Sequence, residues 1–291
     1  MKSLRIILAL LLAIAISNGY CQGTDSLFIS QVKDFVFKEM GIELAGQFYT
    51  HRDTSDEPSY YVYVSLKDRV EKPFGINQDF VSFRSKWNAD VRAMYYHNMG
   101  YEPFIYLAYC YSETPLNKRL MSYRKESVTM IAFHELMHNY ITQLKLDFPY
   151  DFNEAVCDVV GNYGALKYAK DSNKINLNIA KKQLALNEKI YVVLNGCIKN
   201  INANPSQTNL LTAKCQKEIR KLLKHGDSFQ NDRFGFEINT GYLLKNQYYC
   251  KNYFQLKKVF LKQNSLKDFM EIVKHLPSNE SDCQIYLAKY L

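Results

Sequence analysis

Two histidines four residues apart, His134 and His138, are the side chains best placed to do chemistry. Residues i and i+4 of an α-helix share a face, so both imidazole rings can reach one metal ion. Glu135 lies between them, where its carboxylate can take a proton from a water molecule at that ion. Residues 126–133 contain no Gly or Pro and keep the apolar spacing of a helix, so the motif is predicted to be helical. The alternative is a buried pair of histidines with only a structural role.

A catalytic zinc site needs a third protein ligand and leaves its fourth position for water. Pro149 ends the first helix, and a second helix that begins near Asp151 carries Glu154 in its first turn. Because a short connection makes two helices antiparallel neighbours, Glu154 can complete the ligand set. Asp151 and Glu154 also have the spacing of a capping box, in which Glu154 would bond to the helix backbone instead.

Asp158 follows Glu154 by one helical turn and lies on the same face. A histidine that binds a metal normally donates its other ring N–H to a carboxylate, and Asp158 is placed to accept that bond. The alternative for Asp158 is a solvated helix carboxylate. Cys157 and Cys110 are expected to be buried and not to bind the metal.

The pattern H-E-x-x-H followed by N-E-A-x-x-D-x-x-G resembles that of the gluzincins, the thermolysin-like zinc peptidases whose third ligand is a glutamate. Residues 153–161 carry its second part. The spacing is shorter than in thermolysin and is nearer to that of a bacterial family labelled as aminopeptidases, which has Phe-Asn-Glu where this chain has residues 152–154. The likeness spans residues 105–276 and is strongest over 130–161. The departures from the family pattern are Cys110 and the divergent segment 171–236.

This resemblance implies a zinc-dependent peptidase that acts on peptide or protein substrates, with aminopeptidase action resting on the family label alone. The roles that it implies are Zn²⁺ ligands for His134, His138 and Glu154, general base for Glu135, and acceptor of a histidine N–H for Asp158. It also implies an oxyanion-stabilising tyrosine from the C-terminal helices. Tyr248 is the candidate, and a packing role is the alternative, because the chain has 23 tyrosines.

A second hypothesis is a helical, envelope-associated binding protein whose metal site is structural or inactive. Its support is the basic, divergent segment 171–236. The intact set of metal-binding and proton-accepting groups favours the enzyme, because an inactive site has no need to keep all of them.

Residues 1–21 have the pattern of a secretory signal peptide. Lys2 and Arg5 precede an apolar run at 6–16, which is too short to anchor the chain across a bilayer, and small residues follow at 17–19. We therefore expect an exported protein, periplasmic or secreted, without a transmembrane segment. Cys21 permits a lipoprotein instead, but Tyr20 before it disfavours lipidation.

Export would place the remaining cysteines in an oxidising compartment. They are Cys110, Cys157, Cys197, Cys215, Cys250 and Cys283, which permit up to three disulfides or remain free thiols in the core. The formal net charge is +8, or +6 once Lys2 and Arg5 are subtracted. The C-terminal lysines have solvent-facing spacing and form no known nucleic-acid module, so nucleic acid is not an expected partner.

The order of elements predicts an α+β protein. A small mixed sheet is expected in an N-terminal part, residues 22–116, followed by a mostly helical part, residues 117–291, that resembles a thermolysin-like (gluzincin) catalytic unit. The two parts are expected to form one catalytic unit with a cleft between them, and the strand ending near Ser112 to bind an extended peptide along its edge. The predicted helices are Leu27–Met40 and Asp79–Asn98, and the predicted strands are Glu43–Tyr49, Tyr60–Leu66 and Pro103–Tyr111. After Asn117 the chain is predicted to be helical, with breaks near Pro149, Asp171, Pro205, Asp227 and Pro277.

Overall fold

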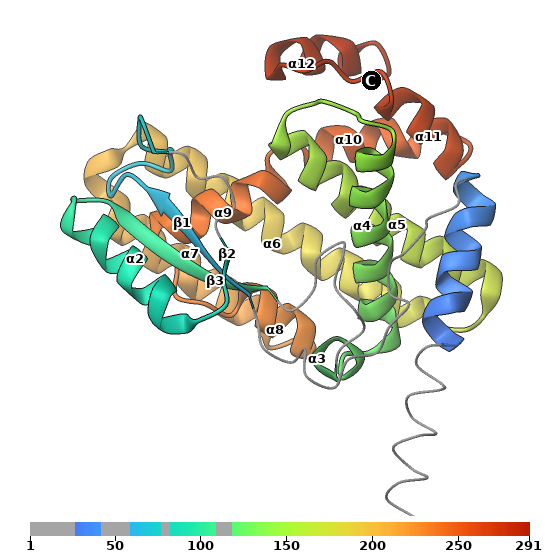
Figure 1. Ribbon diagram of the computed structural model, residues 1–291, viewed down its shortest axis with the longest axis horizontal. Helices are drawn as coiled ribbons and strands as arrows, with labels where there is room; N and C mark the ends of the chain where they lie inside the picture. The colour runs from blue at the N-terminus through green and yellow to red at the C-terminus, as the bar shows by residue number, and fades with distance from the viewer. Residues whose placement is uncertain (1–26, 42–58, 77–81, 109–117) are drawn as a thin grey trace, which may run out of the picture.

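The computed structural model describes residues 27–41, 59–76, 82–108 and 118–291, whose arrangement is shown in Figure 1. The predicted signal peptide with Cys21, the predicted strand at 43–49 and the strand end at 109–112 with Cys110 lie outside the described residues. The first described helix covers residues 27–40, as predicted. It ends at Gly41, which has a φ of +71° and donates its N–H to the carbonyl oxygen of Phe37.

A three-stranded sheet forms the N-terminal part. Its strands are β1 (Ser59–Ser65), β2 (Ser82–Phe83) and β3 (Glu102–Ala108), in the order β2-β1-β3. β1 pairs with β3 over its whole length, with Tyr61 opposite Tyr106. β2 and β3 are both antiparallel to β1, so they run in the same direction but are separated by it. The prediction of a mixed sheet is therefore wrong for the described strands, because no two parallel strands are neighbours.

The helix between β2 and β3 is shorter than predicted. It is α2 (Lys86–Asn98), whereas the sequence pattern suggested a start at Asp79. Phe83 and Ser82 instead pair with Tyr60 and Tyr61 of β1. The predicted start of the helix is wrong because a strand of two residues has no recognisable local pattern and forms only by pairing with its partner strand.

The rest of the described chain is helical. The helices are α3 (Lys118–Met121), α4 (Lys125–Gln143), α5 (Tyr150–Ser172), α6 (Leu177–Ala203), α7 (Thr208–Leu223), α8 (Ser228–Phe234), α9 (Thr240–Cys250), α10 (Tyr253–Leu261), α11 (Leu266–Val273) and α12 (Glu280–Ala288). Four of the five predicted breaks fall in a connection between two of these helices, and the fifth, near Asp171, falls one residue before the end of α5. Further breaks were not predicted, and two of them precede helices capped by Asn239 and Ser265, whose side chains accept backbone N–H groups.

The helices α4 and α5 pack closely side by side in the helical part (Figure 1). Pro149 precedes α5, and the short connection at 144–149 returns the chain along α4, as predicted. Gly161 permits the close approach, because a Cβ atom there would lie 2.9 Å from the carbonyl oxygen of Met130 and 3.3 Å from Cβ of His134. The close packing of the two helices therefore holds the histidine motif of α4 against α5.

One cluster of buried apolar residues continues from the helices into the sheet. It includes Tyr63 of β1 and Phe104 of β3, and the ring of Phe104 packs edge-on against Tyr242 of α9 with 5.2 Å between centroids. In the part of the chain that the structure describes, no helix is both long and apolar enough to cross a membrane.

The five cysteines of the described residues are all buried and all free. They are Cys157, Cys197, Cys215, Cys250 and Cys283. The sequence permits either disulfides or free thiols in the core, and these five cysteines are free core thiols.

Candidate metal centre

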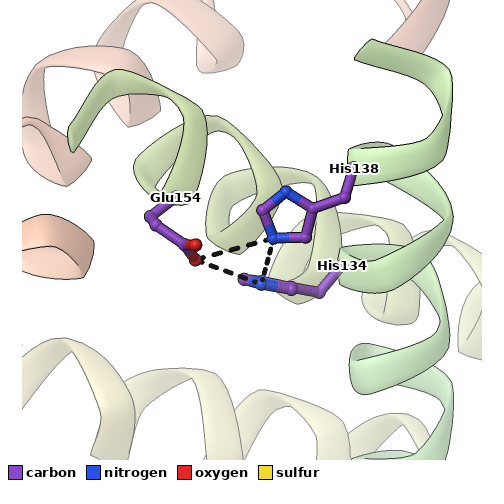
Figure 2. Close-up of side chains that lie close together, drawn as sticks. All are labelled: His134, His138 and Glu154. Carbon is purple, nitrogen blue, oxygen red and sulfur yellow. Dashed lines mark hydrogen bonds and ion pairs between the residues drawn. The ribbon is translucent and has the colours of Figure 1, made fainter. Parts of the chain in front are cut away.

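Three side chains from α4 and α5 converge on one point: His134, His138 and Glu154 (Figure 2). Nε2 of His134 lies 3.1 Å from Nε2 of His138, and Oε2 of Glu154 lies 3.4 Å and 3.6 Å from these two nitrogens. Two ligands of a tetrahedral ion with bonds of about 2.0–2.2 Å are about 3.3–3.6 Å apart. Both distances to Glu154 lie in this range and the distance between the histidines is slightly shorter, so the triangle of donor atoms is close to the size that one such ion requires.

The carboxylate of Glu154 faces the histidines and not the start of its helix. Its Oε1 accepts a hydrogen bond from the hydroxyl of Tyr150, whereas Oε2 is buried and accepts none. The residue before α5 is Pro149, which makes no side-chain cap, so the capping-box alternative is wrong. A buried carboxylate oxygen without a hydrogen bond is costly, and a cation at the centre of the triangle would offset that cost.

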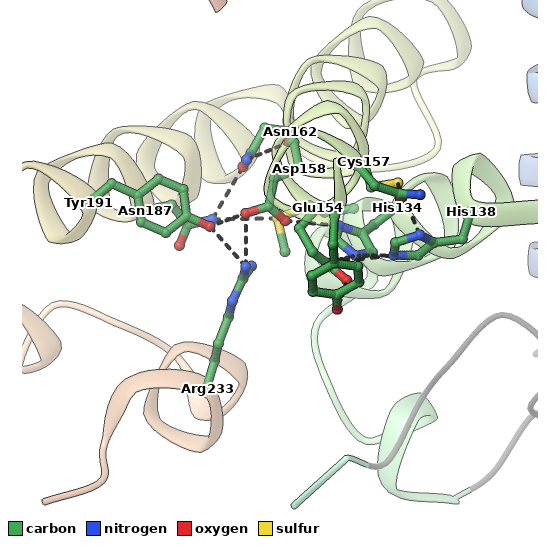
Figure 3. A network of polar contacts seen from close by, with 12 residues as sticks. His134, His138, Glu154, Cys157, Asp158, Asn162, Asn187, Tyr191 and Arg233 are labelled. Atoms are coloured by element: carbon green, nitrogen blue, oxygen red, sulfur yellow. Dashed lines mark hydrogen bonds and ion pairs between the residues drawn. The ribbon is translucent and has the colours of Figure 1, made fainter. Parts of the chain in front are cut away.

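Asp158 contacts the ring nitrogen of His134 that faces away from His138 and Glu154 (Figure 3). Its Oδ1 lies 2.9 Å from Nδ1 of His134, so Nδ1–H donates to the carboxylate and Nε2 faces the centre. This distance confirms the predicted contact, and because Asp158 is only 3% exposed, the solvated alternative is wrong. Its Oδ2 accepts from Nη2 of Arg233 at 2.8 Å and from the hydroxyl of Tyr191.

Cys157 occupies the corresponding position beside the second histidine. Its Sγ lies 3.3 Å from Nδ1 of His138 and 3.5 Å from Oδ1 of Asn153, to which it donates. Cys157 is fully buried, as predicted. A carboxylate, carbonyl or water normally holds such a ring, and a thiol is a weak hydrogen-bonding group. For that reason the contact of Cys157 with His138 could not be predicted from the sequence.

The electrostatics of the triad favour positive charge at its centre. Burial alone would lower the pKa of His134, but its hydrogen bond to Asp158 and its close contact with the Glu154 carboxylate raise that pKa to about 10. Burial would raise the pKa of Glu154, but the charge of His138 and the contacts with both histidines lower it well below its usual range. The carboxylates therefore stabilise either protonated histidines or a metal ion that replaces those protons. Because protons and a metal ion compete for the same ring nitrogens, acid weakens metal binding.

Glu135 lines the same cavity as the triad. Burial is the main influence on its carboxyl group and raises the pKa, against the lowering effect of the nearby histidines. A carboxyl group with a raised pKa is suited to accept a proton from water and to return it to a leaving group.

The cavity has a volume of about 380 Å³ and lies between the sheet and the helices, where the sequence predicted a cleft. Its lining includes Tyr61 and Tyr63 of β1, Tyr106 of β3 and the triad. β3 is an outer strand of the described sheet. Peptide binding along its edge stays a prediction, because its expected end near Ser112 lies outside the described residues.

The tyrosine of α9 that lines the cavity is not the one expected from the sequence, but the residue after it. Tyr248 packs against Tyr150, with 5.0 Å between ring centroids, and does not belong to the cavity lining. Tyr249 does line it, and its ring stacks on His134 with 6.1 Å between centroids and 23° between planes. Burial raises the pKa of Tyr249 well above its usual value, so its hydroxyl remains a hydrogen-bond donor.

Comparisons with models of known families, with curated proteins and with solved structures found no match for this chain.

Proposed function

We propose that this chain is an exported zinc-dependent metallopeptidase of the gluzincin type, which hydrolyses peptide bonds. The observation that carries the proposal is the convergence of three donor atoms beside a buried glutamate in one cavity. The H-E-x-x-H spacing and its resemblance to the thermolysin-like peptidases support it independently. The proposed fold is accordingly a gluzincin-like unit, with α4 and α5 as its metal-binding helix pair.

Zinc is the proposed metal because of the chemistry of the donors. Two imidazoles and one carboxylate are the set found at catalytic zinc, which keeps a fourth position for water, whereas structural zinc usually has four protein ligands. Among the described residues the triad supplies three ligands and opens onto a cavity. Zn²⁺ bound there would polarise a substrate carbonyl and lower the pKa of a water molecule towards about 7.

The side chains of the chain then have separate tasks. Glu135 accepts the proton of the attacking water and passes it to the departing amine. Asp158 and Cys157 hold the histidine rings in place. We assign the donation of a hydrogen bond to the developing oxyanion to Tyr249 rather than Tyr248, because Tyr249 lines the cavity and remains protonated.

Two parts of the proposal rest on sequence alone. Export rests on the signal-peptide pattern of residues 1–21, with a periplasmic or secreted location and with a lipid anchor at Cys21 as the alternative. Aminopeptidase action rests on the family label. Peptides with free and with acetylated N-termini distinguish it from endopeptidase action, since only an aminopeptidase requires the free amine.

The test is metal analysis and peptide hydrolysis with the purified full chain and its Glu135→Gln variant. We expect about one zinc per chain in both proteins, and hydrolysis of a mixed peptide library by the wild type only, because an amide cannot accept the proton of water. Glu126→Gln is the matched control. Glu126 is buried in the same helix, and a glutamine there keeps the oxygen that accepts the N–H of Asn176.

His134→Ala should lose the zinc, since two ligands are too few to hold it. A full equivalent of zinc in that variant would contradict the metal site, and hydrolysis by Glu135→Gln at the wild-type rate would contradict the assigned base. Zinc binding by the wild type with no hydrolysis of any peptide would favour the second hypothesis, a binding protein with a structural or inactive metal site.

A further inference from the structure

The outward face of α2 is apolar, the reverse of an ordinary surface helix. Trp87, Val91, Met94 and Tyr95 are 73%, 44%, 59% and 54% exposed. At about 100° per residue these four positions fall in one sector of the helix. Ala89, the buried residue of α2, lies on the opposite side. Because α2 packs on the sheet through that opposite side, its apolar sector faces outward.

The arrangement is more than a set of scattered exposed apolar residues, which every protein has. The four side chains repeat at the spacing i, i+4, i+7 and i+8, so they form one continuous stripe along the helix. Contiguous apolar patches with a polar border mark interaction surfaces. The metal cavity does not use this stripe, since none of the four residues lines it.

The border of the stripe is basic. Arg84, Lys86 and Arg92 are exposed around it, and the acidic residue of α2, Asp90, is paired with Lys86 at 2.7 Å. The guanidinium of Arg92 lies 5.9 Å from the ring centroid of Tyr95. Exposed Trp and Tyr on an apolar stripe, with Arg and Lys beside it, are typical of helices that lie in the headgroup region of a bilayer. The net charge of +8 for the whole chain has the same sign as this border.

We propose that α2 docks the protein onto an anionic lipid surface, with the apolar stripe at the acyl boundary and the basic border among the phosphates. A second copy of the chain fits the stripe less well. Four side chains from each copy are few beside the roughly 20–30 residues that each partner contributes to a stable protein interface. Two basic borders would also repel each other.

The chain carries its own reporter, because Trp87 is its single tryptophan. With vesicles of mixed phosphatidylglycerol and phosphatidylcholine, we expect the Trp87 emission to shift to shorter wavelength and to be quenched by brominated acyl chains. Phosphatidylcholine alone should give a weaker shift, and added salt should weaken binding to the anionic vesicles. Quenching by acyl chains reports on α2 itself, so binding through residues 1–21 cannot produce it.

The variant Val91→Ser/Met94→Ser keeps the reporter and should bind anionic vesicles about tenfold or more weakly. Leu210→Ser is the matched control, since Leu210 is 68% exposed on α7, and should bind as the wild type does. Circular dichroism verifies the fold of each variant. Three results would overturn the proposal: no change in Trp87 emission with anionic vesicles, equal binding by the double variant, or an emission shift that follows protein concentration without lipid.

Discussion

The carboxylate of Asp158 joins the metal centre to the helices behind it. It accepts from His134 through one oxygen and from Arg233 and Tyr191 through the other. Burial would raise the pKa of Asp158, but the charges of Arg233 and His134 lower it. This side chain therefore orients a proposed metal ligand and also neutralises a buried guanidinium.

We predict that Asp158→Asn weakens both functions. An amide is a poorer acceptor for the N–H of His134, and losses of this kind typically reduce metal affinity about 10–100-fold. The variant also leaves Arg233 buried without a counter-ion, so the free energy of unfolding should fall by about 3 kcal/mol or more. Competition with a chelator measures the first effect, and urea unfolding of the metal-free protein measures the second.

Asp171→Asn is the control for this prediction, because Asp171 lies near the end of the same helix in an exposed pair with Lys167. It should change the free energy of unfolding by less than about 1 kcal/mol and leave metal affinity unchanged. Equal metal affinity in Asp158→Asn and the wild type would show that the contact with His134 has no part in metal binding.

Glu154 and Asp158 of the α4–α5 hairpin were predictable from sequence, whereas the contact of Cys157 with His138 and the partners outside the hairpin were not. Helical spacing and one short connection are enough to bring Glu154 and Asp158 to the histidines. Arg233 is 75 residues from Asp158, and Tyr191 is 33 residues from it, so their contacts depend on how α6 and α8 pack. Tyr248 and Tyr249 differ by one step of a helix, and only the packing of α9 decides which of them faces the cavity.

At the scale of elements, the distance between α4 and α5 sets the geometry of the triad. Gly161 determines that distance near His134, since a Cβ atom there would meet a backbone oxygen and the side chain of this ligand. A backbone oxygen cannot rotate away as a side chain can. Any larger residue at position 161 must therefore separate the two helices or bend one of them.

We predict that Gly161→Ala lowers both the free energy of unfolding, by about 1–3 kcal/mol, and the affinity for zinc. Gly196→Ala is the matched control in the middle of α6, where no atom lies within 4 Å of an added Cβ. That variant should be about 0.5–1 kcal/mol more stable, because alanine favours a helix. Thermal unfolding with and without zinc measures both effects. A Gly161→Ala protein with the stability and zinc affinity of the wild type would show that the helices adjust at no cost.

The elements themselves were predicted best where the signal is local. Pro149, Pro205 and Pro277 marked real helix ends, because proline cannot continue a helix. The two-residue strand β2 was mistaken for the start of α2, because its identity depends on pairing with β1. The direction of strand pairing was likewise not contained in any local pattern.

On the scale of the whole molecule, the sheet and the helices meet around a buried lysine. Lys245 of α9 is 1% exposed, and its Nζ lies 4.1 Å and 4.6 Å from the ring centroids of Tyr106 and Tyr249. Burial, assisted by the charge of Arg233, lowers its pKa to about 7, although Glu154 and Asp158 act in the opposite direction. The cations Lys245 and Arg233 and the carboxylates of the centre thus belong to one electrostatic unit in the helical part, and the ring of Tyr106 brings the sheet into contact with it.

The consequence is a pH dependence of global stability whose sign follows from the two pKa values. The unfolded chain keeps Lys245 protonated up to about pH 10.4, whereas the native protein releases this proton near pH 7. Between these values the unfolded state binds more protons, so this group makes the free energy of unfolding rise with pH. Below about pH 7 burial of the charged ammonium lowers the free energy of unfolding by its full amount, and by about pH 10 this effect has disappeared.

Lys245→Met isolates this contribution, because every other titrating group is shared with the wild type and largely cancels in the difference. With metal removed from both proteins, we predict that the variant is the more stable one at pH 7. Its advantage should shrink by about 1.4 kcal/mol per pH unit between about pH 7.5 and 9.5. Urea unfolding across this range gives the difference directly, and Lys258→Met, at an exposed position of α10, should not change the pH dependence. A constant difference between Lys245→Met and the wild type would mean that Lys245 has the same charge in the folded and unfolded chains, and that the junction of sheet and helices admits water.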